Sequence, residues 1–488
     1  MEVLRNLGRK KGIDVVNARF QKGKAKTGAT IEVCRNLINE GQLQHALVLL
    51  TQRLKESPED KQWLKLTSDC YWEMRRTEQS MMILQWLLEQ DPYDVTLLSR
   101  RGSRMLSLGD KSAAKQAFEA ALQVKPDEVA LICALHVVDP LSPESPQVNR
   151  LKRAAKARKT PEKDRESALN TLGSIASREG DFAQAMEFFQ ASKDCIAMGY
   201  DSAALEALVE SQVETFKASS LQVPASNRQK SRPLFITGVP RSGTTLLETM
   251  LASHSAVATV GESTALQVAK AHIRDECGGS ETNWIWCENL SELNREKART
   301  LYLKGISHFL TELKPWIIDK MPRNIFELGF AAQAMPEARF VYMKRHPLDV
   351  GLSLLSNNFA GNTNEFTKSQ ERIAHYILQS EKSADDMKSK LGCSFRMQSY
   401  REIVDNSEMQ LREILAFLEL PLEESVFNPE ASPIMVKTAS VAQVRQGVNR
   451  KGLGRWHDYE DFLQPLIHAL GGWDWIHAWE EQDRALWT

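Results

Sequence analysis

The sequence predicts an all-α solenoid followed by an α/β domain with a parallel sheet. Three observations support this fold class. Prolines recur every 34 residues in the first half, at Pro58, Pro92 and Pro126. A polar segment without apolar periodicity, residues 217–232, follows this half. Beyond it, short apolar runs alternate with helical stretches, which is the pattern of parallel strands connected by helices.

The composition limits the class of protein. A chain of 488 residues exceeds one compact domain, and 42% hydrophobic with 26% charged residues is typical of a globular protein. The formal net charge of -1 argues against nucleic acid as the main partner. The seven scattered cysteines form no CxxC pair, which favours reduced thiols over disulfides or zinc. No apolar run approaches the roughly 18 residues of a spanning helix, and the start of the chain lacks the apolar core of a secretory signal, so we expect no membrane span and a cytoplasmic location.

Residues 1–28 differ from the rest of the chain in charge. They hold eight lysines and arginines against Glu2 and Asp14. A basic segment of this kind is usually a solvated tail. Binding to a membrane surface or to an acidic partner is the alternative.

Residues 29–216 contain the expected solenoid. Gly41 and Gly109 lie two 34-residue periods apart, and residues 178–194 are a later copy of the same pattern. A helical period of this length resembles the tetratricopeptide repeat, in which small residues let two helices approach closely and a proline ends the second helix. Such a solenoid commonly presents a concave surface to a partner protein. A purely structural or self-associating solenoid is the alternative.

The second half has the pattern of a doubly covered parallel sheet. Residues 217–232 are the expected linker, and residues 233–488 are the expected α/β domain. Apolar runs predict strands at 233–239, 315–321, 338–344 and 394–400. Helices are expected between or after them at 242–253, 347–358 and 408–420.

The turn after the first of these strands, GVPRSGTT at residues 238–245, predicts an anion site. It almost fits the nucleotide-binding pattern G-x-x-x-x-G-K-[ST], but Thr244 stands where that pattern requires lysine. Gly238 and Gly243 allow the backbone to approach an anion, and the start of the following helix offers N–H groups and a positive dipole end. Side chains that would add hydrogen-bond donors are those of Arg241, Ser242, Thr244 and Thr245.

This loop resembles that of the sulfotransferases that use 3′-phosphoadenosine-5′-phosphosulfate (PAPS). Their loop follows a strand and often reads PxSGTT, and PRSGTT is that form. Within the family, GVPRSGTTL is most similar to the tyrosylprotein sulfotransferases and to bacterial sulfotransferases fused to tetratricopeptide repeats. The resemblance covers about residues 233–470 and implies a P-loop-like parallel-sheet domain, PAPS as sulfonate donor and no metal.

The resemblance also implies contacts to the rest of the nucleotide. The family's 3′-phosphate site is an arginine at a strand end and a serine eight residues later, which here are Arg345 and Ser353. Tyr400 matches a tyrosine that lines the nucleotide, and a late closing loop matches at Ser440 and Arg455. The complete set implied for the cofactor is Arg241, Ser242, Gly243, Thr244, Thr245, Arg345, Ser353, Tyr400, Ser440 and Arg455.

Sulfonate transfer to a hydroxyl needs a base for the proton and a cation for the departing phosphate. Counting from Arg241, Glu262 falls where the tyrosylprotein enzymes carry their catalytic glutamate, and Lys320 matches the family's catalytic lysine. Arg241 and Ser440 would assist at the sulfonate. His254 is the alternative base, since other branches of the family use histidine.

The acceptor and two rival functions stay open at this point. The repeats favour a polypeptide acceptor, tyrosine included, whereas Thr264 replaces the family's substrate-gripping arginine and leaves a sugar hydroxyl or small phenol open. Pairing of two copies as a homodimer is also open. One rival is a magnesium-dependent P-loop nucleotide hydrolase or kinase with Asp319 as metal ligand. The other is a repeat scaffold with an inactive transferase domain.

Overall fold

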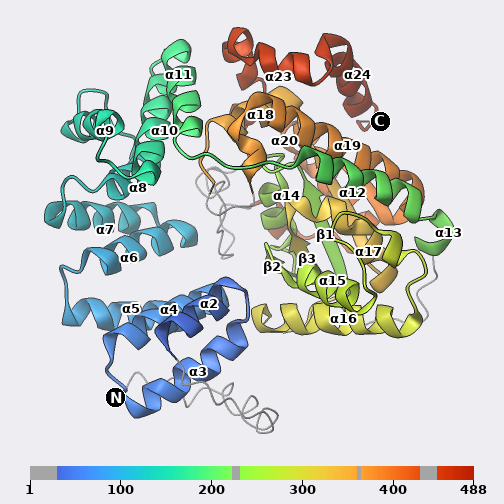
Figure 1. Cartoon of the computed structure of the whole chain (residues 1–488), viewed down its shortest axis with the longest axis horizontal. Coiled ribbons are helices and arrows are strands. Elements are labelled where there is room, and N and C mark those ends of the chain that lie inside the picture. Colours follow the sequence, from blue (N-terminus) through green and yellow to red (C-terminus); the bar gives the residue numbers. More distant parts are fainter. Residues whose placement is uncertain (1–29, 222–230, 311, 360–363, 429–447, 488) are drawn as a thin grey trace. The chain divides into compact units, whose positions relative to one another are not determined.

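The computed structural model describes residues 30–221, 231–310, 312–359, 364–428 and 448–487 (Figure 1). The described chain divides into two compact units. The first holds residues 30–105 and 110–126, and the second holds residues 106–109 and 127 onward. The expected fold class is confirmed, because helical repeats precede a domain built on a parallel sheet.

The first unit is built from helices that end where the prolines require it. Among the described residues, its helices are α2 (Ile31–Asn39), α3 (Leu43–Glu56), α4 (Lys61–Glu73), α5 (Thr77–Gln90), α6 (Val95–Leu108) and α7 (Lys111–Val124). Helices α3, α5 and α7 each stop two residues before Pro58, Pro92 and Pro126, because the residue before a proline disfavours the helical conformation. The 34-residue period is therefore a period of helix pairs.

A second stretch of repeat helices belongs to the second unit. It comprises α8 (Val129–Val138), α9 (Pro146–Lys156), α10 (Glu162–Arg178), α11 (Phe182–Asp194), α12 (Ser202–Thr215) and α13 (Ala218–Leu221). A Cβ atom on Gly173 would lie 2.6 Å from the Phe189 ring, just as one on Gly102 in the first unit would lie 2.5 Å from the Phe118 ring. The same close helix approach thus recurs in both units. The expected linker at 217–232 stays a prediction. Helices α11 and α12 pack against the α/β elements, and α10 joins them through side-chain hydrogen bonds.

A five-stranded parallel sheet lies at the centre of the second unit. Its strands are β1 (Arg232–Gly238), β2 (Val257–Gly261), β3 (Trp316–Lys320), β4 (Arg339–Lys344) and β5 (Phe395–Ser399), in the spatial order β2-β3-β1-β4-β5. All four pairings are parallel. Four strands match the sequence prediction, whereas β2 was missed because its sequence, VATVG, holds only two large apolar residues.

Helices cover both faces of the sheet (Figure 1). They are α14 (Thr244–Leu251), α15 (Ala265–Glu276), α16 (Glu292–Ile306), α17 (Leu328–Ala334), α18 (Pro347–Leu355), α19 (Gln370–Leu391), α20 (Tyr400–Asp405), α21 (Ser407–Phe417), α23 (Gln464–Ala469) and α24 (Gly472–Arg484). Short 3₁₀ helices add η3 (Pro322–Glu327), η6 (Glu424–Phe427), η8 (Arg450–Gly452) and η9 (Arg455–Leu463). Along β1, Phe235 stacks on Phe340 in one core cluster, while Ile236 packs with Leu247 in the other, as alternation across a strand requires. Within the described ranges, no helix has both the length and the apolarity to cross a bilayer.

Candidate active site

The parallel sheet brings the predicted residues together at one edge. The loop at 239–243 follows β1, Lys320 ends β3, Arg345 follows β4 and Tyr400 follows β5. Because all strands run in the same direction, their carboxyl ends meet at the same edge, which is where ligands bind in open α/β sheets. Residues that are more than 150 positions apart in the sequence therefore surround one loop.

The loop between β1 and α14 has a backbone that depends on its glycines. Gly243 has a φ of 101°, and a Cβ atom there would lie 2.4 Å from the Tyr400 ring. A Cβ atom on Gly238 would lie 2.6 Å from the Ser242 hydroxyl oxygen. Arg241 also has a positive φ, 77°, which costs energy for a residue other than glycine. The loop is thus held in a conformation that its surroundings must impose.

Arg345 is the side chain that imposes much of this conformation. Its Nη1 donates to the Arg241 carbonyl oxygen at 2.6 Å, and its Nη2 donates to the Gly452 carbonyl oxygen at 2.5 Å. Its guanidinium lies over the Tyr400 ring, 4.8 Å from the centroid. Two buried donors at this point, Arg345 Nε and the Ser242 hydroxyl, have no hydrogen-bond partner among the described residues. Such donors fit an anionic ligand.

Arg241 carries a buried positive charge into the loop, beside that of the partly buried Arg345. Its Nε donates to the Ser353 hydroxyl at 2.9 Å, so the two arginines and the serine expected around the nucleotide are in one network. Burial, together with the nearby Arg345 charge, lowers the pKa of Arg241 to about 10. Arg241 therefore stays charged at neutral pH, and a bound anion would offset the repulsion between the two guanidinium groups.

The expected base and cation form an ion pair on the other side of the loop. Lys320 Nζ lies 2.5 Å from Glu262 Oε1 and 3.7 Å from Glu248 Oε2. The Lys320 side chain is 1% exposed, whereas the Glu262 side chain is 43% exposed. Glu248 is fixed in turn by the Thr259 hydroxyl, which donates to its Oε1 at 2.6 Å. A buried ammonium and a solvent-facing carboxylate thus meet at the ends of β3 and β2.

The remaining residues predicted to bind the cofactor differ in burial, and one of them lies outside the described residues. Thr244 and Thr245 are buried in the first turn of α14, where the N–H groups of the helix start also lie. Arg455 is exposed at the start of η9 and lies close enough to contribute to the lowered pKa of Arg241. Ser440 lies outside the described residues.

The alternative base, His254, has both ring nitrogens engaged elsewhere. The Ala256 backbone N–H donates to Nδ1 at 3.0 Å, and Nε2 lies 2.9 Å from the Pro421 carbonyl oxygen. Glu423 Oε1 is a further 3.6 Å neighbour of Nδ1. These contacts fix the imidazole, which is 2% exposed, against the segment before η6 and favour a structural role.

Asp319, the metal ligand of the rival hypothesis, faces away from the loop. It pairs in register with Phe235 and so lies on the opposite face of the sheet from Lys320. The carboxyl is fully buried, its Oδ1 lies 3.5 Å from Asn324 Nδ2, and burial raises the pKa of Asp319 well above its ordinary value. A carboxyl in this position is poorly placed to bind a cation at the loop.

Sequence reasoning missed Asp349, which anchors the C-terminal end of the late loop. Its two carboxylate oxygens accept from the Gly454 N–H at 2.8 Å and from the Trp456 N–H at 3.2 Å. Asp349 lies in the first turn of α18, a position where an acidic residue looks like ordinary helix capping. Only the fold reveals that it holds a segment more than 100 residues away.

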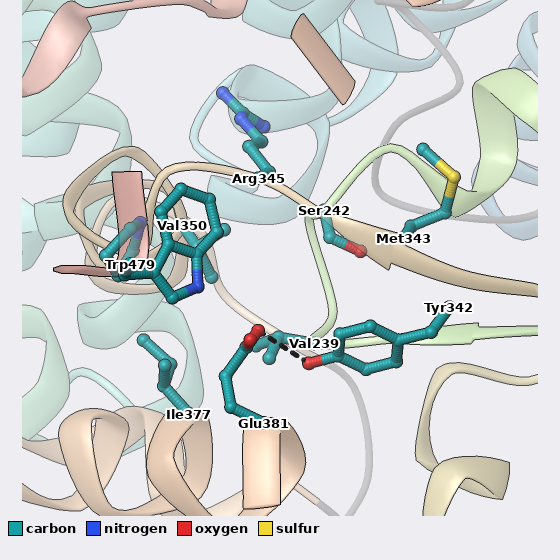
Figure 2. A pocket seen from close by; sticks show the side chains of 10 residues that line it. Val239, Ser242, Tyr342, Met343, Arg345, Val350, Ile377, Glu381 and Trp479 are labelled. Atoms are coloured by element: carbon teal, nitrogen blue, oxygen red, sulfur yellow. Dashed lines mark hydrogen bonds between the residues drawn. The ribbon is translucent and has the colours of Figure 1, made fainter. Parts of the chain in front are cut away.

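A small cavity of about 10 Å³ lies behind the loop, between β4, α19 and α24 (Figure 2). Ser242 and Arg345 line one side, and Glu381 and Trp479 line another. Figure 2 shows the Glu381 carboxylate meeting the Tyr342 hydroxyl, which donates to it at 3.0 Å, while the Arg345 guanidinium points away. The space suits about one water molecule and is far too small for a nucleotide. It is therefore a space behind the loop and not the expected nucleotide site.

Comparison with protein families agrees with this architecture. The description "Sulfotransferase family" matches residues 233–424, which contain the loop, Glu262, Lys320 and Arg345. The description "Tetratricopeptide repeat" matches residues 106–128 and 166–194.

Individual relatives share low identity with this chain. An uncharacterized protein of Aquifex aeolicus (strain VF5) is 26% identical over 89% of this chain and 58% of its own length. A protein-tyrosine sulfotransferase of Drosophila melanogaster is 24% identical over 53% of this chain and 55% of its own length. The chain thus spans somewhat more than half the length of either relative. A solved structure, the sulfotransferase domain of the Synechococcus PCC 7002 olefin synthase, is 19% identical, with a TM-score of 0.35 over 48% of this chain and 90% of that one.

The family match covers the part of the chain that forms the loop and the parallel sheet. The repeat matches fall in the helical segments that precede the sheet. Residues 233–424 of this chain match the sulfotransferase family, and segments that match the tetratricopeptide repeat precede them.

Proposed function

We propose that this protein transfers the sulfonate group of PAPS to a hydroxyl group of an acceptor, by in-line transfer with Glu262 as the base. One observation carries the proposal. A glycine-dependent loop at the carboxyl edge of the sheet carries Arg241 and the Ser242 hydroxyl, which has no partner among the described residues, and Arg345 lies against this loop. Such a site suits a ligand with several anionic groups and needs no metal to neutralise them.

The nucleotide would be held by residues from four segments. The loop N–H groups with Ser242, Thr244 and Thr245 would bind the 5′-phosphosulfate, as helix starts bind phosphate. Arg345 and Ser353 would bind the 3′-phosphate, and Tyr400 would line the nucleotide. Arg455, and Ser440 from outside the described residues, would complete the site. PAPS supplies the activated sulfonate when it is bound.

The proposed transfer step uses Glu262 as the base and Lys320 as a cation. The carboxylate of Glu262 takes the proton of the acceptor hydroxyl as its oxygen forms a bond to sulfur. The bond between sulfur and the bridging oxygen of the 5′-phosphate breaks, and Lys320 and Arg241 stabilise the charge that grows there. Lys320 contacts Oε1 of Glu262 at 2.5 Å, which leaves Oε2 of this exposed carboxylate as the oxygen that would take the proton of the acceptor.

The acceptor we propose is a hydroxyl on a polypeptide, tyrosine included. The Drosophila relative is named for protein tyrosine, and repeats of this type suit a polypeptide partner. Glu262 is exposed, so a side chain of a bulky acceptor can reach it. A cytoplasmic location belongs to the same proposal.

A nucleotide triphosphatase is disfavoured by two features. Thr244 occupies the position of the lysine that clamps a γ-phosphate, and Asp319 faces the opposite side of the sheet. An inactive scaffold is disfavoured because Glu262, Lys320, Arg241 and Arg345 are all present and grouped.

The test is transfer of labelled sulfate from PAPS to a panel of tyrosine peptides, glycans and small phenols, with and without EDTA. We expect the full chain to label at least the peptide class, and chelation to have no effect. Absence of labelling for every acceptor, with PAPS binding intact, would support the inactive scaffold. Labelling confined to glycans or phenols would refute the polypeptide acceptor while leaving sulfonate transfer in place.

A further inference from the structure

Two of the repeat helices in the second unit pack against the elements that carry the donor site. Helix α11 contacts both α18 and η9, and α10 and α11 pair closely with one another (Figure 1). Helix α18 carries Ser353, and η9 begins at Arg455. The helix pair matched as a tetratricopeptide repeat at 166–194 therefore lies directly behind two segments expected around the nucleotide.

The first link runs through Tyr459 of η9. Its hydroxyl donates to the Ser177 hydroxyl of α10 at 2.7 Å, and its ring meets that of Phe182 of α11 edge-on at 5.1 Å. The Tyr459 side chain is buried, so this contact fixes η9 firmly against the repeat pair. Since Gly452, three residues before η9, binds Arg345 through its carbonyl oxygen, the repeat pair and Arg345 hold the same short segment from two sides.

The second link is a chain of three hydrogen bonds from the repeat to the loop. Lys193, near the end of α11, is 4% exposed, and its Nζ donates to the Asn357 carbonyl oxygen at 2.6 Å. The Asn357 side-chain amide donates to the Ser353 carbonyl oxygen at 2.8 Å. The Ser353 hydroxyl in turn accepts from Arg241 Nε at 2.9 Å. A buried lysine of the repeat thus supports the serine that orients an arginine of the loop.

From these two links we infer that the repeat pair α10–α11 is a built-in part of the donor site, with Tyr459 and Lys193 as positioning residues for the nucleotide. The inference rests on the proposed function, because it takes PAPS as the ligand of the loop. Neither residue touches the expected ligand. Tyr459 holds the segment that closes on Arg345, and Lys193 holds the end of α18 that presents Ser353.

An ordinary packing role for these contacts makes a different prediction. Packing alone would lower the melting temperature of variants without changing the affinity of the folded protein for the nucleotide. Tyr200 provides a matched control, because it lies just after α11 and its hydroxyl also bonds to the α/β elements, to His375 Nδ1 at 2.6 Å. His375 belongs to α19, which contributes no residue to the expected donor site.

The experiment compares Tyr459→Phe, Lys193→Met and Tyr200→Phe in the full chain. Calorimetric titration with 3′-phosphoadenosine 5′-phosphate gives the Kd, and steady-state assays give the donor KM, the acceptor KM and kcat. Each of the first two variants should weaken nucleotide binding by about fivefold, the effect of one buried hydrogen bond. The donor KM should rise in parallel, with kcat and the acceptor KM unchanged, while Tyr200→Phe should match the wild type in all four.

The outcomes separate the inference from the proposed function. Wild-type affinity in folded Tyr459→Phe and Lys193→Met would overturn the inference and leave sulfonate transfer intact. An equal loss in Tyr200→Phe would also overturn it, since the effect would then be general loosening of the interface. If the wild type itself binds no nucleotide, the proposed function fails and the inference fails with it. Melting temperatures without ligand establish that each variant is folded, and either of the two variants suffices if the other does not fold.

Discussion

Arg345 is the residue whose loss should affect the donor site most clearly. Replacement by alanine removes Nε, the guanidinium nitrogen that has no partner among the described residues and is free to bind a phosphate. It also removes the hydrogen bonds from Nη1 and Nη2 to the Arg241 and Gly452 carbonyl oxygens. A hydrogen bond from a charged donor contributes about 1.5–3 kcal/mol, so binding of 3′-phosphoadenosine 5′-phosphate should weaken by roughly 10- to 150-fold. Loss of the two carbonyl bonds should lower the free energy of unfolding by about 1–3 kcal/mol as well.

The assay is calorimetric titration at fixed ionic strength, with urea unfolding of the same samples. Arg339→Ala is the matched control, because Arg339 lies at the far end of the same strand, donates to the Cys393 carbonyl oxygen at 2.9 Å and lies 5.3 Å from the Phe417 ring centroid. It should lose stability but keep nucleotide affinity. Wild-type affinity in Arg345→Ala, or an equal loss in Arg339→Ala, would refute a phosphate-binding role for Arg345.

Three further predictions concern the base, the loop and the pH dependence of stability. Glu262→Ala should lower sulfonate transfer by roughly 100- to 10,000-fold without changing nucleotide affinity in the titration, and full turnover would remove Glu262 from the mechanism. Gly243→Ala should weaken nucleotide binding at least about tenfold in the same titration. The reason is that a φ of 101° is strained for alanine and that its Cβ atom would lie 2.4 Å from the Tyr400 ring. Unchanged binding would contradict the need for glycine at this position. Burial raises the pKa of Asp483 from 3.8 to about 6, so the folded state holds this proton more tightly than the unfolded state, and the stabilisation is present below pH 3.8 and lost as the pH rises through 6. Asp483→Asn keeps an acceptor for the Ser399 hydroxyl. In urea unfolding, the free energy of unfolding of this variant should exceed that of the wild type by up to roughly 3 kcal/mol at pH 7.5 and should equal it near pH 4. A constant difference across this pH range would contradict the assigned pKa shift.

The sequence was sufficient for features that are encoded locally. The loop at 238–245, the apolar runs of β1, β3 and β4 and the 34-residue period each depend on neighbouring residues, and the structure places them as expected. Strand β2 was missed because Val257 and Val260 are its only large apolar residues, too few to stand out from the surrounding sequence. The helical period likewise gave no sign that α10 and α11 would pack on α18 and η9.

Contacts between distant segments could not be predicted without the fold. The bond between Tyr459 and Ser177 joins residues that are 282 positions apart, and Asp349 binds N–H groups 105 and 107 positions away. No sequence pattern around these residues indicates that either contact will form. The ion pair of Glu262 and Lys320 was expected only as two separate roles, since their contact depends on the order β2-β3-β1 in the sheet.

The central claim is that the loop with Thr244 in place of lysine binds a phosphosulfate nucleotide and not a nucleoside triphosphate. The most direct measurement is a competition titration of the full chain with 3′-phosphoadenosine 5′-phosphate and with ATP, each with magnesium and with EDTA. We predict that 3′-phosphoadenosine 5′-phosphate binds equally well under both conditions and that ATP does not displace it. Tighter binding of ATP that requires magnesium would contradict the claim and identify the site as that of a nucleotide hydrolase or kinase.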